Sequence, residues 1–285
     1  MQQRQARLEK IYRFVRKMPS LPTSVSKVLE ICIRTDASPN DLNKVISLDP
    51  VLTGQVLKLI NSAYYSLVNE VTSLTRAIIM LGLNTVKNMA LSSAIISCVG
   101  QSKKSKALPV KAFWAHSLGV GVVAKLLAGE RNVPMGEREE YFVAGLLHDL
   151  GKFPFDDEYT DVVHTARTNT QPLIKVEREL LEIDHAEVGL LIAEKWKLNN
   201  AITETIRYHH DPDAASEENR ALVATVALAD FFVCLFDIGF AGNRFPDEAV
   251  LERALVLSGL HWSTVVGLFD RVNEEISKAE IFLQA

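Results

Sequence analysis

The chain has 285 residues, of which 48% are hydrophobic and 23% are charged, and its formal net charge is -4. This composition can bury the core of one large or two smaller domains, and 10 Pro and 14 Gly leave room for long helices. No apolar run reaches the roughly 18 uncharged residues of a membrane span, and the polar N-terminus lacks the apolar stretch of a signal peptide. We therefore expect a cytoplasmic protein without a membrane partner.

Charge is divided unevenly along the chain. Residues 1–110 carry 15 Lys and Arg against 6 Asp and Glu, whereas residues 111–285 carry 16 against 29. The two parts can attract one another, or a basic surface can meet an acidic partner. Because the basic residues are spread over several predicted helices without a nucleic-acid-reading motif, we interpret them as a solvated face and do not expect nucleic acid as a partner. The three cysteines show no Cys-x-x-Cys spacing and are expected to be free thiols.

The first predicted element is a helical arm over residues 1–17. Leu8, Ile11, Tyr12 and Val15 recur at helical spacing, so one side of the arm should pack against the rest of the protein. Five helices are then predicted over residues 18–100. Two of them begin at the pairs Ser38-Pro39 and Asp49-Pro50, which are typical of an N-cap followed by proline in the first turn. This compact unit has no cluster of titratable groups, so the sequence offers no active site there.

Residues 101–110 are polar and basic and end near a proline, so they are the predicted linker. The remaining residues, 111–285, should form a second helical domain. Its predicted helices cover residues 110–127, 137–150, 176–183, 184 onward, 200–210 and 222–236, with two more after residue 247. Asp184 is expected to cap its helix together with Glu187, and Gly151 is expected to supply the turn that follows the helix ending at residue 150.

The stretch around His148 and Asp149 is the most informative part of the chain. Adjacent imidazole and carboxylate donors suit Fe, Mn, Zn or Ni rather than Ca, although a single such pair is more often an ordinary histidine before an N-cap. Four further histidines and one aspartate lie on or beside apolar helical patterns: His116, His185, His209, His210 and Asp230. Neighbouring helix residues point about 100° apart, which favours two metal ions with an aspartate between them. His164 and His261 match no such pattern and are interpreted as structural.

The order His, His-Asp, His, His-His, Asp resembles the HD superfamily of metal-dependent phosphohydrolases, in particular its HD-GYP-like branch of bacterial signalling phosphodiesterases. Residues 47–65 and 73–88 resemble the HDOD domain, a regulatory relative of HD-GYP, and the similarity extends from Met18 to about Asp230. The resemblance implies an all-α fold. In it, an N-terminal HDOD-specific helical subdomain packs on an HD-type helical domain.

The same resemblance implies a ligand set. One metal would be held by His116, His148, Asp149 and Asp230, and a second by Asp149, His185, His209 and His210. Asp149 would bridge the two metals, and Lys152 would hold a phosphate oxygen, so these two residues are the candidate catalytic groups. We expect two divalent transition metal ions, with Fe first and Mn, Zn or Ni as alternatives.

Two functions remain open from the sequence. After His210 the chain lacks the Gly-Tyr-Pro element of HD-GYP enzymes, and HDOD proteins resemble phosphodiesterases that have lost activity. We therefore favour a bacterial signal-transduction module: its N-terminal subdomain binds an unknown signalling protein, and its metal site is a platform that takes a nucleotide or phosphate ligand. The alternative is an active phosphohydrolase or phosphodiesterase acting on a nucleotide or cyclic dinucleotide, and the complete ligand set favours it.

Overall fold

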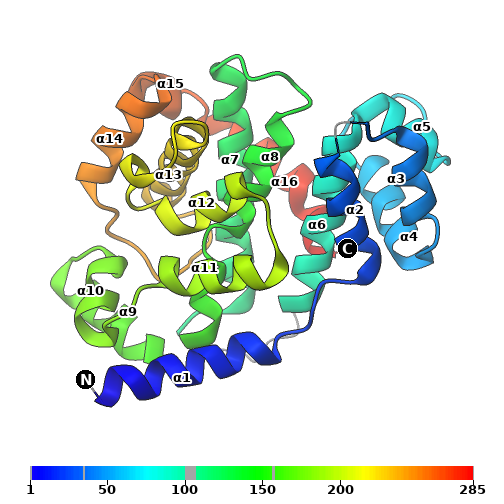
Figure 1. Ribbon diagram of the computed structural model, residues 1–285. Coiled ribbons are helices and arrows are strands. Elements are labelled where there is room, and N and C mark those ends of the chain that lie inside the picture. Colours follow the sequence, from blue (N-terminus) through cyan, green and yellow to red (C-terminus); the bar gives the residue numbers. More distant parts are fainter. Residues whose placement is uncertain (1, 35, 100–106, 156–157, 285) are drawn as a thin grey trace.

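The computed structural model describes residues 2–34, 36–99, 107–155 and 158–284. Over these residues the chain forms sixteen α-helices and three 3-10 helices and contains no strand, so the all-α prediction is confirmed. Helices α2 to α6 gather on one side of the molecule, helices α7 to α15 form the larger group on the other, and α1 runs along its lower edge (Figure 1).

The N-terminal group contains the five predicted helices. Their bounds are α2 (Thr23–Ile33), α3 (Pro39–Ile46), α4 (Pro50–Ile60), α5 (Leu74–Leu81) and α6 (Leu83–Val99). Ser38 accepts a hydrogen bond from the backbone of Asp41, and Asp49 accepts one from the backbone of Leu52, so both predicted N-caps are confirmed. The predicted linker falls mainly on residues 100–106, which lie outside the described residues, and the domain boundaries stay predictions.

The larger group is built around two long apolar helices, α7 (Val110–Glu130) and α13 (Arg220–Leu235), which pack on each other and on α8 (Arg138–Leu147). The other elements are η1 (Leu150–Phe155), α9 (Glu158–Asn169), α10 (Leu173–Leu181), α11 (His185–Trp196), α12 (Asn200–Tyr208), η2 (Pro212–Ala214), α14 (Glu248–Ser258), α15 (Trp262–Val266), α16 (Phe269–Ala279) and η3 (Glu280–Gln284).

Several predicted boundaries in this group are wrong. The helix expected to reach residue 150 ends at Leu147, because the chain tightens into the 3-10 helix η1, and Gly151 lies inside η1. Helix α10 begins at Leu173 rather than at residue 176, and α9 was not predicted because it has few apolar residues. After residue 247 the chain forms three α-helices and η3 instead of two helices.

Helix α7 is long and apolar enough to cross a membrane by length and composition. However, 72% of its most apolar window is buried inside the protein. Burial of this kind is typical of the central helix of a globular core. It is this helix that carries His116 into the interior.

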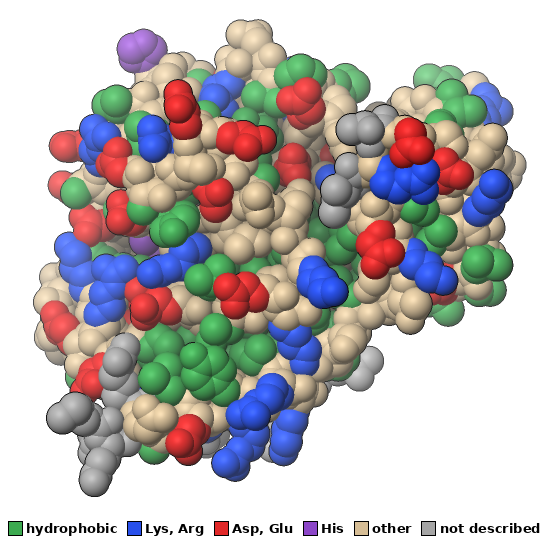
Figure 2. Space-filling view, in the orientation of Figure 1, with side chains coloured by type: hydrophobic (Ala, Val, Ile, Leu, Met, Phe, Trp, Pro, Cys, Tyr) green, Lys and Arg blue, Asp and Glu red, His purple; other side chains and the backbone are tan. Residues whose placement is uncertain are grey.

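The N-terminal arm is helix α1 (Gln2–Lys17). Ile11 and Val15 are buried where α1 packs on α11 and η1, whereas Tyr12, which was expected on the same side, is 45% exposed. Lys and Arg side chains gather at the lower edge of the molecule near the end of α1 (Figure 2). The arm is therefore amphipathic, as predicted, with a narrower packed face.

The end of α1 is held by one lysine from α11. The Lys195 ammonium donates to the backbone carbonyls of Val15 at 2.7 Å, Arg16 at 2.9 Å and Met18 at 2.7 Å. Because the last carbonyls of a helix lack intrahelical partners, Lys195→Ala should destabilise the docked arm by about 1–2 kcal/mol. Hydrogen exchange should show faster exchange in residues 8–17 and unchanged exchange in α13. Equal exchange in α1 of both proteins would contradict this prediction.

Candidate metal centre

The structure brings together all seven residues that the sequence nominated as metal ligands. His116 lies on α7, and Asp230 on α13. His148 and Asp149 follow the end of α8, His185 is the first residue of α11, and His209 and His210 follow α12. The capping box between Asp184 and Glu187 is present as predicted and fixes the start of α11 beneath His185. Whether these residues hold metal stays a prediction.

Asp149 stands between two groups of histidines. Its Oδ2 lies 3.3 Å from Nε2 of His148 and 3.7 Å from Nε2 of His116. Its Oδ1 lies 3.3 Å from Nε2 of His185 and 3.8 Å from Nε2 of His209. Each carboxylate oxygen therefore faces a different group, which is the arrangement that a bridging ligand needs.

The first group consists of His116, His148 and Asp230. Asp230 Oδ1 lies 3.1 Å from Nε2 of His116 and 3.8 Å from Nε2 of His148. One ligand atom from each residue lies within 4.8 Å of the other two. This separation is close to that of atoms bound to one metal at about 2.0–2.2 Å.

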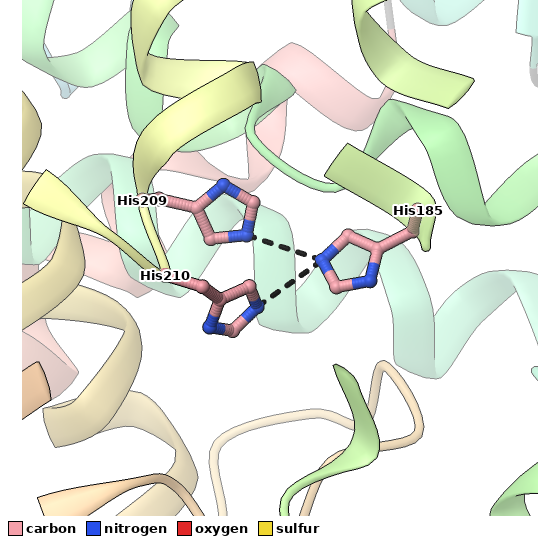
Figure 3. Close-up of side chains that lie close together, drawn as sticks. All are labelled: His185, His209 and His210. Atoms are coloured by element: carbon pink, nitrogen blue, oxygen red, sulfur yellow. Dashed lines mark hydrogen bonds between the residues drawn. The ribbon is translucent and has the colours of Figure 1, made fainter. Parts of the chain in front are cut away.

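The second group consists of His185, His209 and His210 (Figure 3). His185 Nε2 lies 3.2 Å from Nε2 of His209 and 3.2 Å from Nε2 of His210. Three imidazole nitrogens converge here from α11 and the end of α12. Because His209 and His210 would both have to donate to the one lone pair of His185 Nε2, a cation among the three nitrogens fits them better than hydrogen bonds between them.

Hydrogen bonds to Nδ1 aim the Nε2 atoms at the centre. His148 Nδ1 lies 2.6 Å from the carbonyl oxygen of Gly145, and His209 Nδ1 lies 3.1 Å from the carbonyls of Thr205 and Ile206. Because a carbonyl only accepts, Nδ1 carries the proton in both rings and Nε2 is free to bind a metal.

Burial and local charges shift the pKa values of the cluster. Burial lowers the pKa of His209 to about 3, with His148 and His185 adding to the shift, and burial also holds the pKa of His210 well below its usual value. For His148, burial lowers the pKa, but Asp149 and Asp230 outweigh burial and raise it. Burial opposes ionisation of Asp149, yet His148 and Lys152 hold its pKa well below the usual range. The centre thus contains ionised carboxylates beside imidazoles that are held neutral at His209 and His210.

Lys152 is buried beside the bridge position. Its Nζ donates to Asp149 Oδ2 at 2.6 Å and to the carbonyl oxygen of Ala241 at 2.9 Å. Burial lowers the pKa of Lys152, but Asp149 outweighs burial and raises it, so the ammonium stays charged. Two of its three donors are used within the protein, and the predicted contact with a phosphate oxygen stays a prediction.

Most of the centre is buried, although His210 and Asp230 keep some exposure to solvent. His148 and His185 are 0% exposed and Asp149 is 1% exposed, and the cavity that reaches the cluster has a volume of only about 10 Å³. A cavity of that size holds at most one water molecule. Its walls are Pro172, His209, His210, Ala227, Asp230, Phe231, Asn243, Pro246, Asp247 and Val250.

The sequence did not single out Glu177, which lies on α10 and is fully buried against His185. In the sequence it stands midway between Leu173 and Leu181 at helical spacing, so it lies on the apolar stripe of its helix, unlike Glu179 and Glu182. That spacing is the signal that could have found it.

The donor set fits divalent transition metals. Five imidazoles and two carboxylates converge, and Nε2 of His116, Nε2 of His148 and Oδ1 of Asp149 are buried without a hydrogen-bond partner. Buried polar atoms without partners are costly, and a bound cation would satisfy all three. The cluster therefore supports divalent metal binding.

The fold and the sequence resemble known proteins. An HDOD domain protein from Geobacter sulfurreducens matches with a TM-score of 0.76 and 29% identity, covering 98% of both chains. A protein from Shewanella amazonensis that has been provisionally named a phosphohydrolase shares the fold. Its TM-score is 0.70 and its sequence is 24% identical, and the match covers 96% of this chain and 97% of that one.

An uncharacterised protein from Treponema pallidum (strain Nichols) is 27% identical over 225 residues. The match covers 77% of this chain and 43% of the relative, so the chain spans less than half of that protein. The family model of the HDOD domain matches residues 18–212, which is more than half of the chain. The chain belongs to the HDOD family.

Proposed function

We propose that this protein is a bacterial signal-transduction module with a largely buried, metal-loaded HD-type centre. The N-terminal helices would bind a signalling protein, and the centre would act as a metal-stabilised platform that takes a nucleotide or phosphate ligand when it opens. The observation that carries this proposal is the burial of most of the ligand cluster, because the space of about 10 Å³ beside His210 and Asp230 admits no phosphodiester.

The surface of the N-terminal group supports a protein partner. Leu48 is 79% exposed, Val51 is 69% exposed and Ile79 is 66% exposed on α3 to α5 and their connections. A groove of about 360 Å³ adjoins Leu48 and is lined in part by Pro22, Val45 and Pro50. Exposed apolar side chains beside a groove are typical of protein-binding surfaces.

The alternative function is a metal-dependent phosphohydrolase. It is favoured by Asp149, whose two oxygens face both histidine groups, and by Lys152, a buried cation beside the bridge position. In such a site, two bound metals supply a nucleophilic hydroxide and clamp the phosphate. The protein would orient the donors, exclude water and hold the Lys152 proton, and part of the segment 237–247 would have to move.

Both functions require metal bound at the cluster, so the metal content of the protein tests them together. Purified without added metal, it should carry about two equivalents of a transition metal, and the His148→Ala/Asp149→Ala variant should carry almost none, because both groups lose a donor. Plasma mass spectrometry measures this. His164→Ala/His261→Ala is the matched control, because both of these histidines are exposed and lie outside the cluster.

Equal metal content in wild type and the His148/Asp149 variant would overturn the metal site. If the site is present, release of phosphate from nucleotides and of mononucleotides from cyclic dinucleotides separates the two functions. Turnover that is lost in the same variant would establish the phosphohydrolase. Binding of these ligands without turnover would support the signalling platform.

A further inference from the structure

Glu177 is buried against the first residue of α11. It is 0% exposed, and its Oε2 accepts hydrogen bonds from the backbone N–H of His185 at 2.9 Å and from His185 Nδ1 at 2.6 Å. Its Oε1 accepts a hydrogen bond from the hydroxyl of Tyr159, which is also fully buried. The carboxylate is thus held by three donors, and two of them belong to one candidate metal ligand.

The charge of Glu177 has no direct counter-ion, because Lys152, whose pKa Glu177 helps to raise, is hydrogen-bonded to Asp149. Over the described residues the carboxylate forms no ion pair with Lys or Arg, and its only ion-pair contact is the ring of His185. A buried carboxylate is costly unless a positive charge balances it. A metal ion bound at Nε2, on the far side of the same ring, would supply that charge.

We propose that Glu177 is a positioning residue that keeps the proton of His185 on Nδ1 and so presents Nε2 to a metal ion in the group His185, His209 and His210. The proposal rests on the proposed metal-binding function. Tyr159 holds the second oxygen of Glu177 and so fixes the orientation of the carboxylate.

His185 therefore differs from His148 and His209 in how its ring is supported. His148 and His209 are held through Nδ1 by backbone carbonyls, whereas His185 depends on a charged side chain. A hydrogen bond to a carboxylate is stronger than one to a neutral carbonyl and makes the imidazole a more basic ligand. The metal position at His185 should therefore respond to substitution on α10, and the position at His116 and Asp230 should not.

Glu177→Gln tests this role. The amide has nearly the same shape but no charge. With its oxygen at the position of Oε2 it accepts from Nδ1 more weakly, and with its NH2 group there it donates to Nδ1 and moves the proton of His185 to Nε2, where the proton competes with the metal. We expect metal affinity at one of the two positions to fall about 10–100-fold, and the metal content to fall from about two equivalents to about one. In metal-free protein, nitrogen NMR of the imidazoles should show His185 protonated on Nδ1 in wild type and a larger share of the Nε2 tautomer in the variant.

Glu187→Gln is the matched control. Glu187 lies in the same first turn of α11 and bonds the backbone of Asp184, without a hydrogen bond to the ring of His185. This control should leave both the tautomer and the metal content unchanged. If Glu177→Gln does not fold, Tyr159→Phe provides a milder test, with a smaller loss of affinity at the same position.

The outcomes separate this proposal from the proposed function. Absence of metal from wild type would overturn the metal site, whereas the tautomer of His185 in metal-free protein still decides the role of Glu177. An unchanged tautomer with two tightly bound metals in Glu177→Gln would overturn the positioning role and leave the metal site standing. Equal effects of the Gln substitutions at positions 177 and 187 would show that Glu177 only stabilises the start of α11. That result would also overturn the positioning role.

Discussion

Gly151→Ala is expected to lower the free energy of unfolding by about 3 kcal/mol or more. A methyl group on Gly151 would lie 1.8 Å from the carbonyl oxygen of His185 and 2.5 Å from the backbone nitrogen of Gly189. Both are backbone atoms, so no side chain can rotate away, and η1 must separate from α11. Asp149 precedes η1 and His185 begins α11, so the same shift would pull the proposed bridge away from the second histidine group.

Urea unfolding of metal-free protein measures this loss, and metal content measures the damage to the centre. Gly136→Ala is the control, because its added methyl group would meet no atom within 4 Å. That variant should change stability by no more than about 0.5 kcal/mol. If the Gly151 variant is as stable as the Gly136 variant, η1 and α11 have room to separate and their close approach does not hold the centre together.

The comparison of sequence and structure shows why the ligand residues were easier to predict than the residues that support them. His148, Asp149 and Asp230 stand out because titratable groups are rare within apolar helices. Glu177 lies in a charged helix, where its place on the apolar stripe between Leu173 and Leu181 indicates burial but does not show which group it contacts. Its role depends on the packing of α10 against α11, which no spacing along the chain encodes.

Gly151 illustrates a second limit. Glycine after a helix predicts a turn, and the sequence supported that interpretation. In the structure the glycine is needed because the backbones of η1 and α11 touch at this point, and a tertiary contact of this kind leaves no local signal. Helix ends were missed for a related reason, since the tightening of the chain into η1 depends on what it packs against.

Acidification is expected to destabilise the metal-free protein well before its carboxylates are protonated. His209 has a pKa of about 3 in the folded protein against 6.5 as its ordinary value, because burial penalises its charged form. The folded state therefore binds fewer protons than the unfolded state below about pH 6.5, and stability falls as the pH drops. At pH 5 the loss from His209 alone should be about 2 kcal/mol relative to pH 7. The pKa of His210 is also well below its ordinary value, so it adds a loss of the same sign.

The other groups in the centre do not cancel this effect. The pKa of His148 is raised, so its contribution is present at low pH and is lost as the pH rises through its folded value, which opposes the trend in part. The pKa values of Asp149 and Asp230 are lowered from 3.8, so their contributions persist above that pH and stay constant between pH 5 and 7. Between pH 5 and 7, the change in the free energy of unfolding with pH therefore comes mainly from His209 and His210.

Urea unfolding at pH 7 and pH 5, with a chelator present, measures the slope. The His209→Gln/His210→Gln variant should lose most of the pH dependence whatever its stability at pH 7, because it removes the two groups that must stay neutral. An equal loss of stability between pH 7 and pH 5 in both proteins would place the proton uptake elsewhere. A flat response in wild type would mean that both imidazoles accept protons in the folded state, which would require water to reach the ring of His209, which is buried in this structure.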